Sequence, residues 1–176
     1  MIFAKRKYYK SLQSGDDMIL KRMKRRHLRD DAIRFCRLAR SLRPDIVFGA
    51  DIIAGFPTET DEMFERSRDL VEACGLTYLH VFPFSARHGT PAARMPQVRG
   101  DVVKARAASL RALGAERLGA YLETRIGTTT DVLVENGGIG RTPGFTAVQH
   151  AGRPGVIVAT RIVARTSDQL IGEAIA

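Results

Sequence analysis

The segment Ile46–Phe56 (IVFGADIIAGF) most constrains the fold, because it is an almost unbroken run of apolar residues. Such a run is typical of a β-strand buried on both faces, which is the pattern of a parallel sheet covered by helices. Thr60 or Asp61 is expected to cap a following helix, and Gly75 is a natural C-terminal stop for it. Residues 77–84 are predicted to form the next strand.

The residues before this run predict one further strand and two helices. The strand ends near Gln13, and Asp16 or Asp17 caps the first helix. An aspartate at position 30 or 31 is expected to cap the second helix. The first half of the chain therefore reads strand, helix, strand, helix, strand, which calls for parallel strands joined by right-handed crossovers.

The second half of the chain changes in character. A loop rich in Gly, Pro and Arg covers residues 85–100, and residues 101–121 predict a long amphipathic helix. Short β-branched runs separated by turns then predict a small antiparallel β-barrel; the runs are 128–135, 145–150, 155–164 and 169–175. We place a domain boundary near residue 122, giving domains 1–121 and 122–176.

Composition favours an anionic partner. The formal net charge is +9, and residues 1–44 hold 14 of the 28 Lys and Arg but only 4 of the 19 Asp and Glu. Nucleic acid is the first candidate and a membrane surface the second. No apolar run approaches the roughly 20 residues that a membrane-spanning helix needs. Cys36 and Cys74 show no CxxC spacing and are expected to be buried, reduced thiols of a cytoplasmic protein.

Three ordered motifs carry a resemblance to a known family. Ser11–Asp17 (SLQSGDD) with Leu20–Arg25 (LKRMKR) resembles the fourth barrel strand and helix of radical-SAM tRNA methylthiotransferases. Gly49–Thr60 (GADIIAGFPTET) resembles their fifth strand, and Phe82–Ala92 (FPFSARHGTPA) their sixth. Residues 122–176 resemble the TRAM domain, a small β-barrel that binds tRNA in this family.

The sequences of Phe82–Ser85 (FPFS) and Met95–Val98 (MPQV) are most similar to those of the MtaB-like branch, which methylthiolates threonylcarbamoyladenosine beside the tRNA anticodon. The resemblance implies an α/β fold: the C-terminal half of a radical-SAM (β/α) partial barrel followed by a TRAM-like barrel. It also implies the cofactors S-adenosyl-L-methionine (SAM) and [4Fe–4S] clusters. The family's CxxxCxxC motif is absent, and Met1–Lys10 departs from the family pattern, so we expect a missing N-terminal half and no activity of the chain alone.

The resemblance places the cofactor at the carboxyl ends of the strands. It implies six cofactor-binding residues: Ser11, Gln13, Ile53, Gly55, Phe82 and Phe84. Ile53 would pack against adenine, and the missing Cβ of Gly55 would let the cofactor approach the backbone. The alternatives are a plain core position for Ile53, a plain turn for Gly55, a turn cap for Ser11 and Gln13, and core packing for both rings. For Glu59 we favour a helix cap over a bond to the loop backbone.

RNA contacts are expected in two places. In the basic run 21–29, Lys24, Arg25 and Arg26 would contact phosphates, with a solvated helix face as the alternative. In the small barrel, Arg141 and Phe145 would bind RNA through charge and stacking. However, residues 121–176 hold five Arg and five Asp or Glu, so this module is neutral. The four histidines are too scattered for a metal site, and no catalytic residue is assigned.

Three hypotheses follow. The chain is a fragment of a tRNA methylthiotransferase that is inactive alone, or it acts as an RNA-binding module without catalysis, or another polypeptide supplies the missing half and the two form a split enzyme. Iron incorporation tests the first hypothesis and salt-dependent tRNA binding tests the second. The DNA just upstream of Met1 separates truncation from independence.

Overall fold

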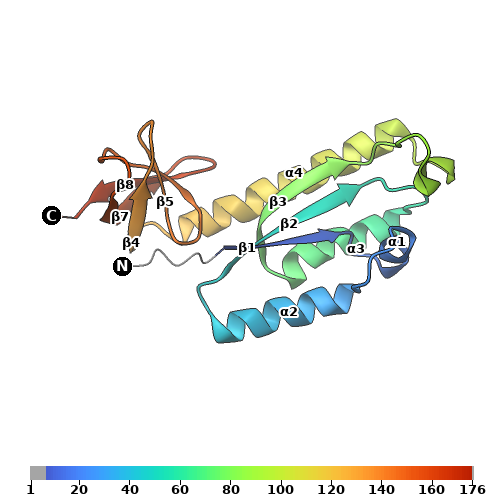
Figure 1. Ribbon diagram of the computed structural model, residues 1–176, viewed down its shortest axis with the longest axis horizontal. Coiled ribbons are helices and arrows are strands. Elements are labelled where there is room, and N and C mark those ends of the chain that lie inside the picture. Colours follow the sequence, from blue (N-terminus) through green and yellow to red (C-terminus); the bar gives the residue numbers. More distant parts are fainter. Residues whose placement is uncertain (1–6, 176) are drawn as a thin grey trace. The chain divides into compact units, whose positions relative to one another are not determined.

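The computed structural model describes residues 7–175 and contains a three-stranded sheet with helices, and a closed β-barrel (Figure 1). Residues 1–6 of the atypical start, which was predicted over residues 1–10, lie outside the described residues. The elements are β1 (Lys7–Gln13), α1 (Asp17–Arg22), α2 (Arg29–Leu42), β2 (Val47–Ala54), α3 (Asp61–Ala73), β3 (Leu76–Pro83), a 3₁₀ helix (Pro91–Arg94), α4 (Gly100–Glu123), β4 (Thr129–Val134), β5 (Ile139–Arg141), β6 (Ala147–Gln149), β7 (Ile157–Arg165) and β8 (Leu170–Ala174).

The described chain divides into two compact units. Residues 8–114 form one, and the other consists chiefly of residues 115–175, so that the division falls inside α4. The domain assignment of 1–121 and 122–176 stays a prediction. No helix of residues 7–175 has the length and apolar character that crossing a membrane requires.

The first unit is built on the sheet β1-β2-β3. Strands β2 and β3 are parallel, with Ala50 opposite Leu79 and Ile52 opposite Val81. Figure 1 shows the three arrows pointing the same way. The βαβαβ order and the parallel sheet predicted from the sequence are therefore confirmed.

The predicted N-terminal caps are confirmed for two of the three helices α1, α2 and α3. The side chain of Asp16 caps α1 by accepting a hydrogen bond from the Ile19 amide at 3.0 Å, and Thr60 caps α3 by accepting one from the Met63 amide at 3.3 Å. The expected cap of α2 is wrong, because Leu28 occupies the N-cap position. Asp31 instead reaches back to accept from the Leu28 amide at 2.9 Å, which satisfies the same end of the helix from inside it.

The basic run 21–29 does not form one face of a helix, so the alternative of a solvated helix face is wrong for it. Helix α1 ends at Arg22, and Lys24 has a φ of 55°, which is the left-handed conformation common just after a helix. The Arg25 amide then donates to the Leu20 carbonyl at 2.9 Å, closing the helix end. Residues 24–28 therefore lie in the connection between α1 and α2.

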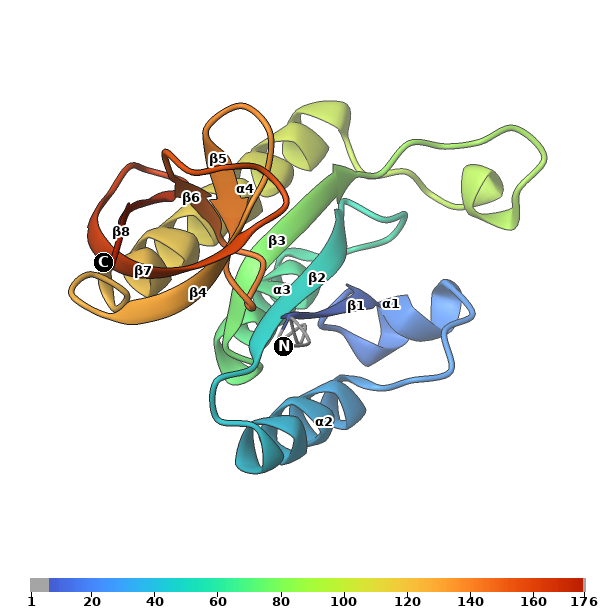
Figure 2. The same ribbon diagram turned by 60° about the vertical axis from the view of Figure 1, so that its left-hand side comes forward.

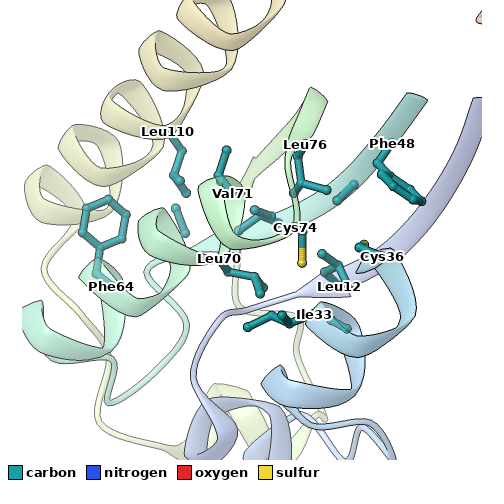
Figure 3. Close-up of a cluster of buried hydrophobic side chains, with 14 of the residues drawn as sticks. Leu12, Ile33, Cys36, Phe48, Phe64, Leu70, Val71, Cys74, Leu76 and Leu110 are labelled. Atoms are coloured by element: carbon teal, nitrogen blue, oxygen red, sulfur yellow. The ribbon is translucent and has the colours of Figure 1, made fainter. Parts of the chain in front are cut away.

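One face of the sheet carries the hydrophobic core. Side chains of all three strands meet those of α2, α3 and α4, as Figure 3 shows for Leu12, Phe48, Leu76, Ile33, Leu70 and Leu110. The opposite face is only partly covered within the described residues. The expectation that β2 is buried on both faces is wrong for Asp51 and Ile53, which are half-buried. These two positions alternate with the core residues Ala50, Ile52 and Ala54, so they point to the open face.

The second unit is a closed barrel with the strand order β4-β5-β6-β8-β7. The predicted small barrel is confirmed, but β6 and β8 are parallel while the other pairs are antiparallel. The short strand β5 was not expected, because Gly137 and Gly138 read as turn. Leu122, near the end of α4, is fully buried with barrel residues of four strands, namely Val132, Val148, Ile162 and Leu170.

A buried ion pair holds the end of β2 against α4. Glu59 accepts from the Gly55 amide and from Arg106 Nη1, both at 2.9 Å, and its carboxylate is fully buried. Thr60, not Glu59, caps α3, so the favoured role of Glu59 as a helix cap is wrong. Gly55 has a φ of +74°, and a Cβ there would lie 2.6 Å from a methyl group of Val103 on α4. Burial raises the pKa of Glu59, although the Gly55 amide and Arg106 act in the opposite direction.

We expect Glu59→Ala to lower the free energy of unfolding by about 2–3 kcal/mol at neutral pH, because it removes the buried carboxylate partner of Arg106 and leaves only the exposed Asp61 carboxylate to pair with the guanidinium. The matched control is Glu65→Ala, which breaks the exposed pair between Glu65 and Arg68. That control should cost less than about 1 kcal/mol. Urea unfolding followed by circular dichroism measures both, and equal losses would contradict the role given to the buried pair.

Candidate cofactor pocket and nucleic-acid surfaces

A pocket of about 460 Å³ lies at the carboxyl ends of the parallel strands, within the first unit. Ligands of parallel α/β folds bind at this edge. The residues lining the pocket come from all three strands and from the loop after β3: Gln13, Asp51, Ile53, Phe82, Pro83, Phe84, Ser85, Arg87, Thr90 and Ala92. The pocket thus combines apolar faces with a few hydrogen-bonding groups, as small-molecule sites do.

Gln13 is held rigidly at the end of β1. Its amide nitrogen donates to the Ser11 hydroxyl at 2.6 Å, and its amide oxygen accepts from Arg25 Nη2 at 2.9 Å. The residue is buried and has a φ of 69°, which is uncommon for a residue other than glycine. These two bonds fix the orientation of the amide that lines the pocket.

The structure brings together four of the six residues predicted to bind the cofactor: Gln13, Ile53, Phe82 and Phe84. Ser11 is not among the lining residues but supports Gln13 through its hydroxyl. Gly55 is not among them either. The space beside its Cα is occupied by Val103, so packing inside the protein accounts for the glycine.

The two aromatic residues at the end of β3 differ in their surroundings. Phe82 is 52% exposed and pairs in register with Ile53, so its ring stands on the open face of the sheet. The Phe84 amide donates to the Ala54 carbonyl at 2.8 Å, which continues the ladder by one residue. Its ring lies 5.2 Å from that of Phe56 in an edge-on arrangement. Core packing, the alternative for both rings, does not describe Phe82.

Sequence reasoning missed Asp51 and Arg87 as pocket residues. A signal for Asp51 was present, since it is the one charged residue in the run 46–56 and lies two residues before Ile53, on the same face of the strand. Asp51 also lies 3.6 Å from Nδ1 of His80 on the neighbouring strand. Arg87 had no such signal, because its position depends on the course of the loop after β3.

A second pocket of about 300 Å³ adjoins the first and shares Ile53, Thr90 and Ala92 with it. Three cations line it, namely Arg22, Lys24 and Arg25, beside the apolar Phe56 and Pro91. Arg22 donates to the Thr58 hydroxyl at 2.6 Å, and Arg25 is bonded to Gln13. Of the three predicted phosphate contacts, Lys24 and Arg25 therefore border this pocket, whereas Arg26 is exposed outside its lining.

The two RNA contacts predicted in the barrel lie at one hairpin. Arg141 ends β5 and forms an ion pair with Glu135 at 3.3 Å. Phe145 lies in the loop between β5 and β6 and is 38% exposed. The hairpin is seen in Figure 2.

The two cysteines are not arranged to bind an iron–sulfur cluster. Cys36 and Cys74 are free and buried in the core of the first unit, as predicted (Figure 3). The hydrogen bond between them lowers the pKa of the Cys36 thiol and raises that of Cys74. Within residues 7–175, no group of three or more His, Cys, Asp or Glu side chains is placed to hold a metal. These residues do not fit the thiolate ligands of a [4Fe–4S] cluster.

Comparison with known proteins agrees with the geometry. The family model of the radical SAM superfamily matches residues 4–71. The chain is 54% identical over 142 residues to the threonylcarbamoyladenosine tRNA methylthiotransferase MtaB of Rickettsia prowazekii (strain Madrid E), a match that covers 81% of this chain and 34% of that relative.

Two further relatives are tRNA-2-methylthio-N(6)-dimethylallyladenosine synthases. That of Cereibacter sphaeroides (strain ATCC 17029) is 39% identical over 92% of this chain and 39% of its own length. That of Agrobacterium fabrum (strain C58) is 38% identical over 92% of this chain and 38% of its own length. The chain therefore spans somewhat more than a third of the length of its relatives. By these matches, together with its parallel sheet and small barrel, the chain belongs to the radical-SAM tRNA methylthiotransferases.

Proposed function

We propose that this chain is part of a tRNA methylthiotransferase that adds a methylthio group to threonylcarbamoyladenosine next to the anticodon. The observation that supports this most directly is the pocket at the strand ends, where Gln13, Ile53 and Phe82 meet. The 54% identity to a relative named for threonylcarbamoyladenosine favours this base over the dimethylallyl base. We also propose a cytoplasmic location, with tRNA as the partner.

The pocket residues fit the SAM that the family implies. Ile53 and Phe82 offer apolar surface on adjacent strands, suited to the faces of adenine. The Gln13 amide and the Asp51 carboxylate offer hydrogen bonds to polar groups of the cofactor. In the family, SAM bound beside a reduced cluster supplies the radical chemistry. The residues of this chain would bind and orient SAM and exclude water from one side of it.

SAM binding tests the pocket assignment. We expect Phe82→Ala to raise the dissociation constant for SAM about tenfold, since removing a ring that packs on the ligand costs on the order of 1.4 kcal/mol of binding free energy. Leu42→Ala, at a position 74% exposed on α2, is the matched control and should bind as the wild type does. Isothermal titration calorimetry measures both. Unchanged SAM affinity of Phe82→Ala would remove Phe82 from the site.

The cluster requires ligands that residues 7–175 do not offer, and we therefore propose that the chain is inactive alone. After anaerobic reconstitution with iron and sulfide, the purified chain is expected to hold no stoichiometric iron and to show no cluster absorbance. It should not cleave SAM under reducing conditions. Stoichiometric iron together with reductive SAM cleavage would show that the inactivity proposal is mistaken.

RNA binding is the second proposed function, and the exposed cations after α1 support it. Lys24 and Arg26 are exposed in the connection to α2, while Arg25 is bonded to Gln13. Phosphate contacts by these cations would supply affinity that does not depend on RNA sequence.

The double variant Lys24→Glu/Arg26→Glu leaves Arg25 in place and is expected to weaken tRNA binding at least tenfold at low salt. The slope of log affinity against log salt should become shallower, because fewer counterions are released. Lys104→Glu/Arg111→Glu reverses two exposed charges on α4 and serves as the control. Fluorescence anisotropy with labelled tRNA measures the affinities, and equal weakening by both variants would argue for net charge in place of a specific surface.

A further inference from the structure

The second pocket, beside the candidate cofactor pocket, combines cations with apolar residues. Nine of the described residues line it: Arg22, Met23, Lys24, Arg25, Ile53, Phe56, Thr90, Pro91 and Ala92. Three of the nine are basic and none is acidic. A pocket of this composition suits a ligand with an anionic end and an apolar part, because no carboxylate of the lining competes for the cations.

Two of these cations are held at the pocket with donors to spare. Arg22 Nη1 donates to the Thr58 hydroxyl at 2.6 Å, and the Thr58 amide donates to the Pro96 carbonyl at 3.1 Å. The Arg22 guanidinium has further N–H donors beyond this bond. The Lys24 amide donates to the Lys21 carbonyl at 3.0 Å, and in the part of the chain that the structure describes the Lys24 ammonium forms no ion pair. Both side chains therefore retain donors for a ligand.

The place of the pocket relates it to the base that reacts. It shares Ile53, Thr90 and Ala92 with the candidate cofactor pocket, so the two adjoin. A base that reacts with bound SAM must lie beside the cofactor, and a substituent of that base then lies within reach of the second pocket. Arg22 and Lys24 line the second pocket and not the first.

The bases named for the relatives differ in the charge of their substituents. A threonylcarbamoyl group contains threonine coupled through its nitrogen, so it keeps a free carboxylate that is ionised at neutral pH. A dimethylallyl group is a hydrocarbon without charge. Cations at the place of the substituent would bind the first and would lose their hydration without compensation against the second.

We propose that Arg22 and Lys24 select the base by binding the carboxylate of its threonylcarbamoyl substituent in the second pocket. The inference rests on the proposed function and adds the residues that recognise its substrate. RNA phosphate fits this pocket less well, because a phosphate gains nothing from the apolar Phe56, whereas the hydrocarbon part of the threonyl group packs on it. The carboxylate of SAM is another anion, and Arg25 is the cation on that side, through its bond to Gln13.

Binding of two synthetic anticodon stem-loops tests the inference. One carries threonylcarbamoyladenosine, and the other carries the same substituent with a neutral carboxamide in place of the carboxylate. The wild-type chain should bind the first about tenfold more tightly, the difference between a charge-assisted hydrogen bond and a neutral one. The ratio of the two dissociation constants isolates the carboxylate, because both RNAs share the same phosphates.

Lys24→Asn removes one charge, and asparagine tolerates the left-handed φ of 55° at this position, so the fold is kept. This variant should lower the ratio to about threefold or less, and Arg22→Gln/Lys24→Asn should bring it near one. The matched control Arg26→Asn removes an exposed cation outside the pocket lining. It should weaken the binding of both RNAs alike and keep the wild-type ratio. Fluorescence anisotropy with labelled stem-loops measures the constants.

A wild-type ratio near one, or an equal fall of the ratio in Lys24→Asn and Arg26→Asn, overturns the inference while the proposed function stands. Calorimetry with SAM separates the two anions of the site. If Lys24→Asn loses SAM affinity and keeps the ratio, the pocket serves the cofactor and the inference is overturned. If the wild type binds neither stem-loop, the proposed RNA binding itself fails and the inference falls with it.

Discussion

The buried pair of Glu59 and Arg106 is the interaction on which the first unit depends. A carboxylate without exposure to water must be hydrogen-bonded, and Glu59 receives one bond from the Gly55 amide at the end of β2 and another from α4. The same guanidinium reaches Asp61 in the first turn of α3 at 2.6 Å. The Arg106 guanidinium and the Glu59 carboxylate thus connect the residue after β2, the start of α3 and the distant helix α4.

The one-sided core determines where chemistry is possible. Alternation along β2 sends Ala50, Ile52 and Ala54 to the helices, and it sends Asp51 and Ile53 to the other face. Parallel pairing in register then places Phe82 beside Ile53. The pocket residues therefore follow from strand period and register, and only the loop residues after β3 need a further explanation.

Sequence patterns were sufficient where the signal is local or periodic. The apolar run predicted β2, and Thr60 predicted the start of α3. Four of the six residues predicted to bind the cofactor line one pocket, while their role in binding stays a prediction. The patterns failed where the outcome depends on distant partners. Glu59 looks like a helix cap until Arg106 is placed beside it, and Gly55 looks like a site for ligand approach until Val103 fills that space. Such long-range contacts leave no mark at short spacing.

Strained backbone conformations occur mainly at the candidate sites. Within residues 7–175, four residues other than glycine have positive φ: Gln13, Lys24, Thr58 and Phe145. Gln13 and Lys24 line the two adjoining pockets, and Thr58 accepts a hydrogen bond from Arg22 at the second. Each of these conformations costs roughly 1–3 kcal/mol and persists because the surroundings over-determine it. Three lie at the pockets, where hydrogen bonds and a helix end enforce them. Phe145, the fourth, lies in the hairpin between β5 and β6, where its amide donates to the Thr142 carbonyl at 2.8 Å and closes the turn.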